Sequence, residues 1–165
     1  KLMTREKFNE LLKNIKDEDN FRLFHDEFCP LATKFCLYQY GNKEVAKAMS
    51  EDFFQYIRTT DLPYIQNPEG WLYSMCKQLG KKNSENNPTV NEQAKLFSDF
   101  NDEMSVEIWH AMGQLTESER DVVILKWFCG YTLKEAANIM DKPYDTVIKM
   151  HNRLKGKLKN ILSSN

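Results

Sequence analysis

The side chains with the clearest chemical capacity are cations near the carboxyl end of the chain. Residues 142–159 hold six bases against the single acid Asp145, namely Lys142, Lys149, Arg153, Lys155, Lys157 and Lys159. The stretch before it, residues 99–121, has seven acids and one base, and the whole chain carries a net charge of −1. A basic segment on a balanced chain is typical of an element that binds nucleic-acid phosphates, although a solvated helix face gives the same pattern.

Residues for catalysis or metal binding form no recognisable motif. The sequence has no G-x-S-x-G, P-loop or H-E-x-x-H pattern, and His110 and His151 have no acidic or nucleophilic neighbours in a known motif. His25 and Cys29 have a spacing that can place two zinc ligands on one helix face, but only Cys36 follows nearby. We therefore expect packed thiols and a surface histidine, with no metal, no cofactor and no enzymatic activity.

The compartment is predicted from cysteine usage and hydropathy. The four cysteines contain no C-x-x-C pair, the start of the chain has no apolar signal core, and no apolar run approaches the roughly 20 residues of a membrane span. We expect reduced thiols, a cytoplasmic protein and no membrane contact.

The positioning elements are predicted to be helices throughout. Apolar residues recur at steps of three and four and nowhere alternate with period two. The stripes cover residues 8–15, 21–38, 45–57 and 71–79, with Gly41-Asn42 as a turn and Asn67-Pro68 opening the fourth helix. Residues 80–93 are polar, contain Gly80 and Pro88, and have no apolar period, which indicates a flexible linker. The expected fold is all-α, with helical domains at 3–79 and 94–165.

Two capping boxes organise the second domain. Thr116 and Glu119 form the first, before a helix that Gly130 is placed to stop in a left-handed conformation. Thr132 and Glu135 form the second, before a short helix over residues 133–140. Asp141-Lys142 then makes a tight turn, and Pro143 suits the first position of another helix.

A short helix, a tight turn and a longer basic helix together predict a wingless helix-turn-helix. The second helix of such a motif lies in the major groove, where its first residues meet base edges and later bases meet phosphates. We expect Tyr144, Asp145, Thr146 and Lys149 at base edges. An ordinary helical hairpin in a bundle has the same spacing.

The second domain also resembles a known family. The matching stretches are residues 115–125, residues 130–140, Thr146-Val147, Arg153 and Leu158, which look like region 4 of the sigma-70 family of RNA polymerase sigma factors, closest to the extracytoplasmic-function group (group IV). This resemblance implies DNA contacts at Thr132, Lys134, Tyr144, Asp145, Thr146, Lys149, Arg153 and Lys157.

Segments of the first domain are similar to region 2 of the same family. Residues 24–30 look like its first helix, residues 41–54 resemble the helix that docks on polymerase, and residues 67–76 are similar to the helix that opens the minus-ten element. The implied polymerase contacts are Met49, Glu51, Asp52 and Phe53. The implied DNA contacts are Trp71, Tyr73, Ser74, Lys77, Gln78 and Lys81, with burial in the core as the alternative for Trp71.

The resemblance implies a sigma factor that binds core RNA polymerase and promoter DNA, is held by an anti-sigma factor in some members, and is a monomer when free. The chain departs from the family at Lys47 and Ala48, where an acidic pair is usual, and at His151, where leucine is usual. The first departure motivates one alternative, a stand-alone helix-turn-helix regulator that does not bind polymerase. A helical adaptor that binds no DNA is a third hypothesis.

Overall fold

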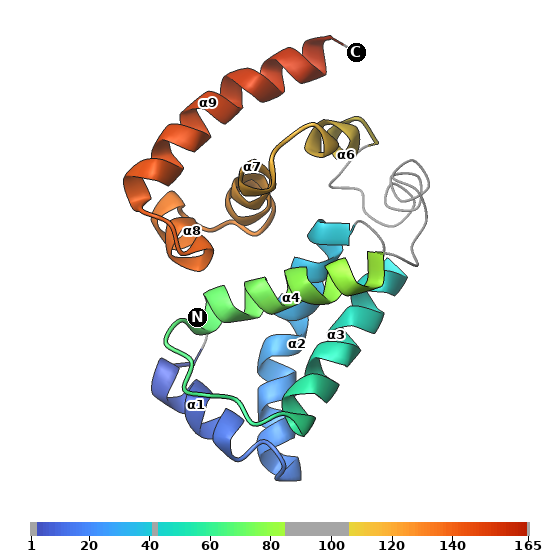
Figure 1. Cartoon of the computed structure of the whole chain (residues 1–165), viewed down its shortest axis with the longest axis vertical. Coiled ribbons are helices and arrows are strands. Elements are labelled where there is room, and N and C mark those ends of the chain that lie inside the picture. The colour runs from blue at the N-terminus through green and yellow to red at the C-terminus, as the bar shows by residue number, and fades with distance from the viewer. Residues whose placement is uncertain (1–2, 41–42, 85–105, 165) are drawn as a thin grey trace. The chain divides into compact units, whose positions relative to one another are not determined.

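The computed structural model describes residues 3–40, 43–84 and 106–164, and every regular element within them is a helix. The all-α prediction is therefore confirmed. The chain divides into two compact units, residues 1–40 with 44–86 (unit 1) and residues 41–43 with 87–165 (unit 2). Figure 1 shows the helices of unit 1 in blue to green and those of unit 2 in yellow to red. Among the described residues, no helix is long and apolar enough to cross a membrane.

Unit 1 is built from four helices, which are α1 (Arg5–Lys13), α2 (Glu18–Tyr40), α3 (Lys43–Thr59) and α4 (Pro68–Ser84). Helices α1 and α4 both pack on α2. Large aromatic and aliphatic side chains fill the space between them and are fully buried, among them Phe8, Phe24, Phe28, Phe35, Phe53, Met49, Ile57 and Leu72. The predicted apolar stripes thus point into one core.

Helix α4 is longer than the sequence predicts. It continues through residues 80–84, where the apolar period ends and the linker was expected to begin. Extending an existing helix adds one hydrogen bond per residue fixed, so a polar stretch without an apolar face still propagates it. The rest of the predicted linker, residues 85–93, and the predicted turn Gly41-Asn42 lie outside the described residues. The domain bounds stay a prediction.

Unit 2 contains the described helices α6 (Val106–Gly113), α7 (Glu117–Val122), η1 (Val123–Phe128), α8 (Leu133–Met140) and α9 (Tyr144–Ser163). Helix α9 packs against α6, α7 and α8. Ala136 and Ala137, the small residues of α8, are buried in this packing. Their lack of bulk lets neighbouring helices approach α8 closely.

Both predicted capping boxes are present. Glu119 N–H donates to Thr116 Oγ1 at 3.2 Å, and Thr116 N–H donates to Glu119 Oε1 at 2.8 Å. The corresponding distances for Thr132 and Glu135 are 3.1 and 3.0 Å. Gly130 has a φ of 76°, the left-handed conformation that its position predicts.

Pro143 departs from its prediction. It stands at the N-cap of α9 with φ −58° and ψ 140°, so the helix begins one residue later, at Tyr144. The proline ring fixes only φ, and the extended ψ lets the chain enter α9 from the turn. The turn itself depends on Asp141, a non-glycine residue at φ 53°.

The end of the helix before Gly130 is a π-helix, η1. Cys129 N–H donates to Ile124 C=O at 2.8 Å, a bond over five residues instead of four. The wider turn rotates the residues that follow relative to an α-helical spacing. Trp127, within this turn, is 42% exposed, whereas Ile124 and Leu125 are buried.

Replacing Thr132 with alanine is expected to destabilise unit 2 by about 1 kcal/mol, since the N-cap hydroxyl satisfies a backbone N–H that otherwise has no intrahelical partner. Urea unfolding followed through NMR signals of α8 and α9 measures the change for unit 2 alone. Thr146→Ala is the matched control, because it removes the same atoms from the first turn of α9 without touching a cap, and it should stay within about 0.5 kcal/mol of the parent chain. An equal loss of stability in the Thr132 and Thr146 variants would contradict the capping role of Thr132.

Candidate nucleic-acid interface

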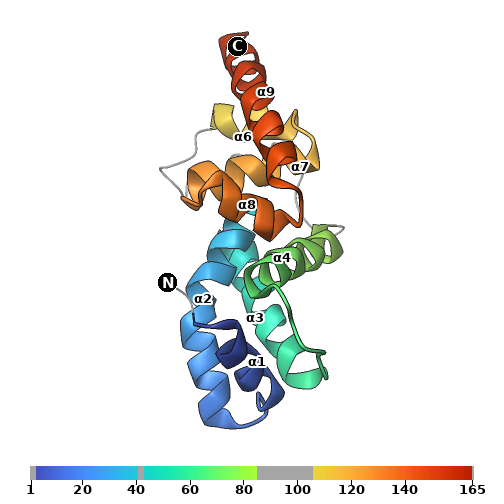
Figure 2. The same cartoon turned by 90° about the vertical axis from the view of Figure 1, so that its left-hand side faces the viewer.

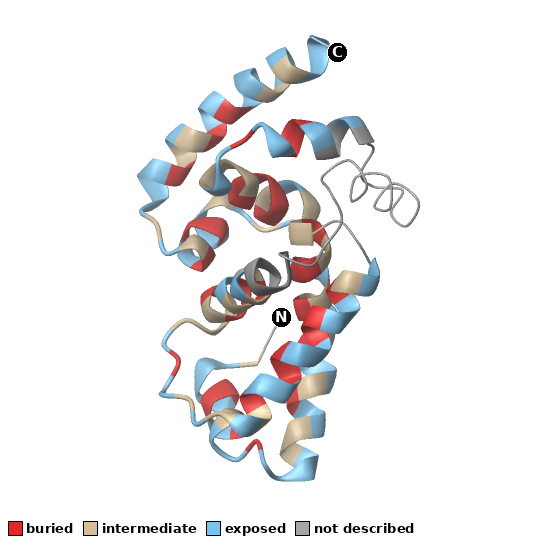
Figure 3. Ribbon diagram, turned by 45° about the vertical axis from the view of Figure 1, so that its right-hand side comes forward, coloured by how far each residue is buried: buried red, intermediate tan, exposed pale blue. Residues whose placement is uncertain are grey.

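The orientation of α9 about its own axis decides which of its side chains reach solvent. Val147, His151 and Leu154 are buried, with spacings of four and three that define one face. Figure 3 shows these buried positions along α9 beside a largely exposed outer side. The residues that the sequence predicts at base edges and phosphates therefore lie on the face away from the core.

The turn between α8 and α9 sets the direction of α9. Lys142 N–H donates to Ala137 C=O at 3.0 Å, which closes the end of α8 around the left-handed Asp141. Figure 2 shows α8 and α9 leaving this turn in clearly different directions, with α9 projecting from the unit. This is the geometry of a helix-turn-helix, in which the second helix is free to enter a groove of DNA.

The exposed face of α9 holds the predicted contacts. Tyr144 is 42% exposed, and Asp145, Thr146, Lys149 and Arg153 are exposed as well. Thr146, Lys149 and Arg153 line a shallow groove of about 310 Å³ together with Thr116, Glu119 and Met150. The groove therefore joins the start of α7 to the middle of α9, with two cations on its α9 side.

Lys157 has a partner inside the unit. Its Nζ lies 2.8 Å from Glu119 Oε1, the carboxylate that also closes the first capping box. Burial acts to raise the pKa of Glu119, but hydrogen bonds from Lys157 and Thr116 outweigh it, so the pKa of Glu119 lies below its ordinary value. The ion pair ties the second half of α9 to α7 and neutralises one of the predicted phosphate contacts.

The two predicted DNA contacts at the start of α8 differ in whether the side chain already has a hydrogen-bond partner within the unit. Lys134 is exposed in the first turn of α8. Thr132 is exposed too, but its hydroxyl accepts the N–H of Glu135 in the second capping box. Hydrogen bonds from Thr132 hold the pKa of Glu135 below its ordinary value. Thr132 thus has a structural role that explains its position without any DNA contact.

His151 occupies the centre of the buried face of α9. Its ring centroid lies 5.3 Å from that of Trp127, and the residue is 7% exposed. Burial lowers the pKa of His151, and the charges of Lys155 and Lys126 lower it further, against a hydrogen bond with Asn152 that acts in the opposite direction. The neutral imidazole is therefore the form that suits the folded unit.

The predicted DNA contacts of unit 1 do not share one environment. Ser74 and Gln78 are exposed on α4, and Lys77 is half-buried with its Nζ 5.7 Å from the centroid of the Tyr73 ring. Tyr73 itself is only 3% exposed and its hydroxyl accepts a hydrogen bond from Gln39 at 2.8 Å. We therefore leave Tyr73 out of the interface proposed below.

Trp71 lies among core aromatics. Its ring centroid is 5.6 Å from that of Phe53 and 6.0 Å from that of Phe8. These contacts fit the core alternative for Trp71, which is half-buried. The side chain of Lys81 lies outside the described residues.

Only half of the predicted polymerase contacts on α3 are accessible. Glu51 and Asp52 are exposed. Met49 and Phe53 are 0% exposed and belong to the core of unit 1, because they lie on the apolar face that α3 turns inward. Lys47 and Ala48, the positions that depart from the family, are exposed on the same helix.

His25 and Cys29, the pair considered as zinc ligands, have separate partners. The His25 ring lies 4.5 Å from the Phe54 ring centroid, and Cys29 Sγ lies 3.9 Å from Thr33 Oγ1. In the described parts of the chain no three His, Cys, Asp or Glu side chains gather as a metal site. All four cysteines are free thiols.

Sequence reasoning missed the α7 side of the groove. The spacing of Thr116 and Glu119 predicts a capping box but no groove, and nothing in the sequence points to Met150 as its neighbour. The capping box showed where α7 begins but not which helix its first turn faces, because that depends on the packing of α7 against α9. The sequence carries no local signal for this contact, since Lys157, the partner of Glu119, is 38 positions away.

Comparison with known families identifies part of unit 2. Residues 111–160, which are 50 of the 165 residues, match the family model of Sigma-70, region 4. The matched range contains α8, the groove and every predicted contact on α9. The match makes this unit similar, over less than a third of the chain, to the DNA-binding region 4 of sigma-70 proteins. No curated protein matches the chain.

Lys149→Ala and Arg153→Ala are each expected to weaken binding to duplex DNA and to reduce the slope of log affinity against log salt by about 1, since each contact with a phosphate releases one condensed counterion. The matched control is Lys159→Ala, on the same helix but outside the groove, which should change the slope little. Binding measured by fluorescence anisotropy at several salt concentrations gives the slopes. An unchanged slope for both groove variants rules out the groove as the phosphate-binding surface.

His151→Leu is expected to make the stability of unit 2 less sensitive to acid. Because the folded pKa of His151 is depressed, the unfolded chain takes up the proton more readily, so stability is complete above the unfolded pKa of about 6.5 and falls as the pH decreases through it. Urea unfolding of unit 2 followed by NMR between about pH 8 and pH 5 measures this. The control His110→Leu, at an exposed position of α6, should keep the acid sensitivity of the parent. If the unfolding free energies of the His151 variant and the parent depend on pH in the same way, His151 is not the cause of the acid sensitivity.

Proposed function

We propose that the protein is a sigma factor of the extracytoplasmic-function type, which binds core RNA polymerase and directs promoter recognition and transcription initiation. The observation that carries the proposal is the coincidence of two findings in unit 2. The region 4 match over residues 111–160 covers α8 and most of α9. These same two helices form the helix-turn-helix, and α9 has an exposed basic face. In this function α9 lies in the major groove of the minus-thirty-five element, where Lys149 reaches a base edge and a neighbouring phosphate and Arg153 binds phosphates.

In the same function unit 1 holds the polymerase and the minus-ten element. The domain assignment is region 2 for residues 3–79 and region 4 for residues 94–165. Exposed Glu51 and Asp52 on α3 offer carboxylates to polymerase, and exposed Ser74 and Gln78 with Lys77 on α4 offer polar contacts to DNA. The motif order along unit 1, which agrees with region 2, supports this division. The proposal extends to a cytoplasmic, monomeric protein that an anti-sigma factor regulates.

A run-off transcription assay tests the function. The full chain is mixed with core polymerase and a library of promoter fragments, and transcripts that depend on the chain are expected. Glu51→Lys should lower transcript yield and polymerase affinity together, because it reverses a charge on the proposed docking face, while leaving DNA binding by unit 2 unchanged. Glu44→Lys, an exposed acid in the first turn of the same helix, is the matched control.

Three outcomes are distinct in this assay. DNA binding without polymerase association would support the stand-alone regulator instead of the sigma factor. Neither activity would support an adaptor. Transcripts that Glu51→Lys and Glu44→Lys reduce equally would keep the function but reject Glu51 as a specific polymerase contact.

A further inference from the structure

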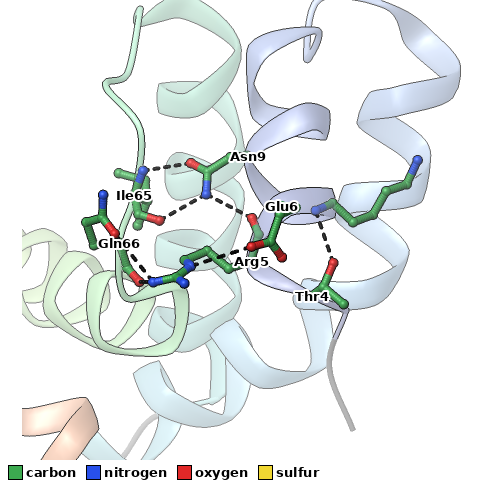
Figure 4. Close-up of polar contacts among 7 residues, drawn as sticks. Thr4, Arg5, Glu6, Asn9, Ile65 and Gln66 are labelled. Carbon is green, nitrogen blue, oxygen red and sulfur yellow. Dashed lines mark hydrogen bonds and ion pairs between the residues drawn. The ribbon is translucent and has the colours of Figure 1, made fainter.

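Asn9 makes three hydrogen bonds from a buried position, and two of them reach a distant loop. Its Nδ2 donates to Ile65 C=O and to Arg5 C=O, both at 2.9 Å, and its Oδ1 accepts the Ile65 N–H at 2.6 Å. Figure 4 shows the amide of Asn9 facing the backbone of Ile65. The residue is 8% exposed. One side chain of α1 thus satisfies both backbone groups of a residue 56 positions further along the chain.

The loop that Asn9 holds leads directly into α4. Ile65 is followed by Gln66, Asn67 and then Pro68, the first residue of α4. Asn67 Oδ1 accepts the N–H of Gly70 at 3.2 Å, which fixes the first turn of the helix to the loop. Arg5 adds an exposed contact, with Nη1 at 3.3 Å from Gln66 C=O. The position of the start of α4 therefore depends on the contact between α1 and Ile65.

The buried amide of Asn9 does more than fill space. An apolar side chain of similar size would leave the Ile65 N–H and C=O buried without partners, which costs about 1–3 kcal/mol per group. The paired donor and acceptor of Asn9 also specify one register of the loop, since any shift of Ile65 along the chain breaks both bonds. Buried polar networks with every member satisfied are rigid and select a single arrangement.

We propose that Asn9 is a positioning residue for the DNA-facing side of α4: it clamps Ile65, and through Asn67 it fixes the orientation in which α4 presents Ser74 and Gln78 to promoter DNA. The proposal rests on the function proposed above. Asn9 does not touch DNA. It acts on promoter opening through the loop, and it leaves polymerase binding by α3 and duplex binding by unit 2 unaffected.

The test compares Asn9→Leu with Asn14→Leu in the full chain. Asn14 is the matched control, because it lies at the end of the same helix and its exposed amide donates to Glu10 C=O within α1, with no bond to the loop. Three quantities are measured: exchange of the Ile65 N–H with solvent in the free chain, affinity for core polymerase, and open-complex formation by permanganate reactivity of unpaired thymines. The promoter is one selected in the run-off assay.

Asn9→Leu is expected to accelerate exchange of the Ile65 N–H and to lower open-complex formation, each by about tenfold or more, since a buried donor and acceptor lose their partners. Its polymerase affinity should stay within about twofold of the parent, as should every property of the Asn14 variant. Arg5→Met, which removes the exposed contacts with Gln66 and the surface ion pair with Glu6, should shift exchange and opening in the same direction by less, and it serves if the leucine variant does not fold.

Unchanged open-complex formation would overturn the proposal. A fall in polymerase affinity parallel to the fall in opening would also overturn it, because it would mean that Asn9 merely stabilises unit 1. If the parent chain forms no open complex, the proposed function fails, and the positioning role fails with it. Exchange of the Ile65 N–H, which needs neither polymerase nor DNA, then still reports whether the clamp exists.

Discussion

The phase of α9 is the constraint on which the interface depends. Helix α9 buries Val147, His151 and Leu154 against the rest of unit 2. Because an α-helix turns by about 100° per residue, a shift of one position would carry Lys149 and Arg153 toward the core and bring apolar residues outward. The same burial that stabilises the unit thus selects which cations of α9 face solvent. This explains how a chain with a net charge of −1 presents a basic groove.

Local signals in the sequence were enough to predict how α8 begins and which glycine precedes it. A capping box joins residues only three positions apart, and a glycine in a left-handed conformation is a property of a single residue. Thr132, Glu135 and Gly130 therefore have the roles that their spacing predicts. The predicted position of Pro143 within α9 was wrong by one residue. The proline ring restricts only φ, whereas the turn at Asp141 determines the ψ of Pro143.

Contacts between distant segments were beyond prediction from one sequence. Tyr73 has the spacing of a surface residue on α4, yet its ring and hydroxyl are taken up by Phe35 and Gln39 of α2. The π-helical turn that exposes Trp127 has no sequence signature that a period of 3.6 could reveal. The bond between Asn9 and Ile65 is likewise invisible, since a lone asparagine in an amphipathic helix normally indicates a solvated position. Packing decides each of these cases, and packing is a property of the folded unit.

The charge of the groove explains why the proposed function needs two points of attachment, one in each unit. Among the described residues Lys149 and Arg153 of the groove form no ion pair, whereas Lys157 pairs with Glu119. Duplex affinity at physiological salt rises steeply with the number of phosphates contacted, so a surface with few unpaired cations binds weakly by itself. A second attachment elsewhere raises the effective concentration of the groove at its site to about the millimolar range for a short flexible tether. Weak intrinsic binding then favours DNA that both units contact over duplex that α9 meets alone. The ion pair between Glu119 and Lys157 contributes to that selectivity by engaging a cation of α9 that would otherwise be available to phosphates.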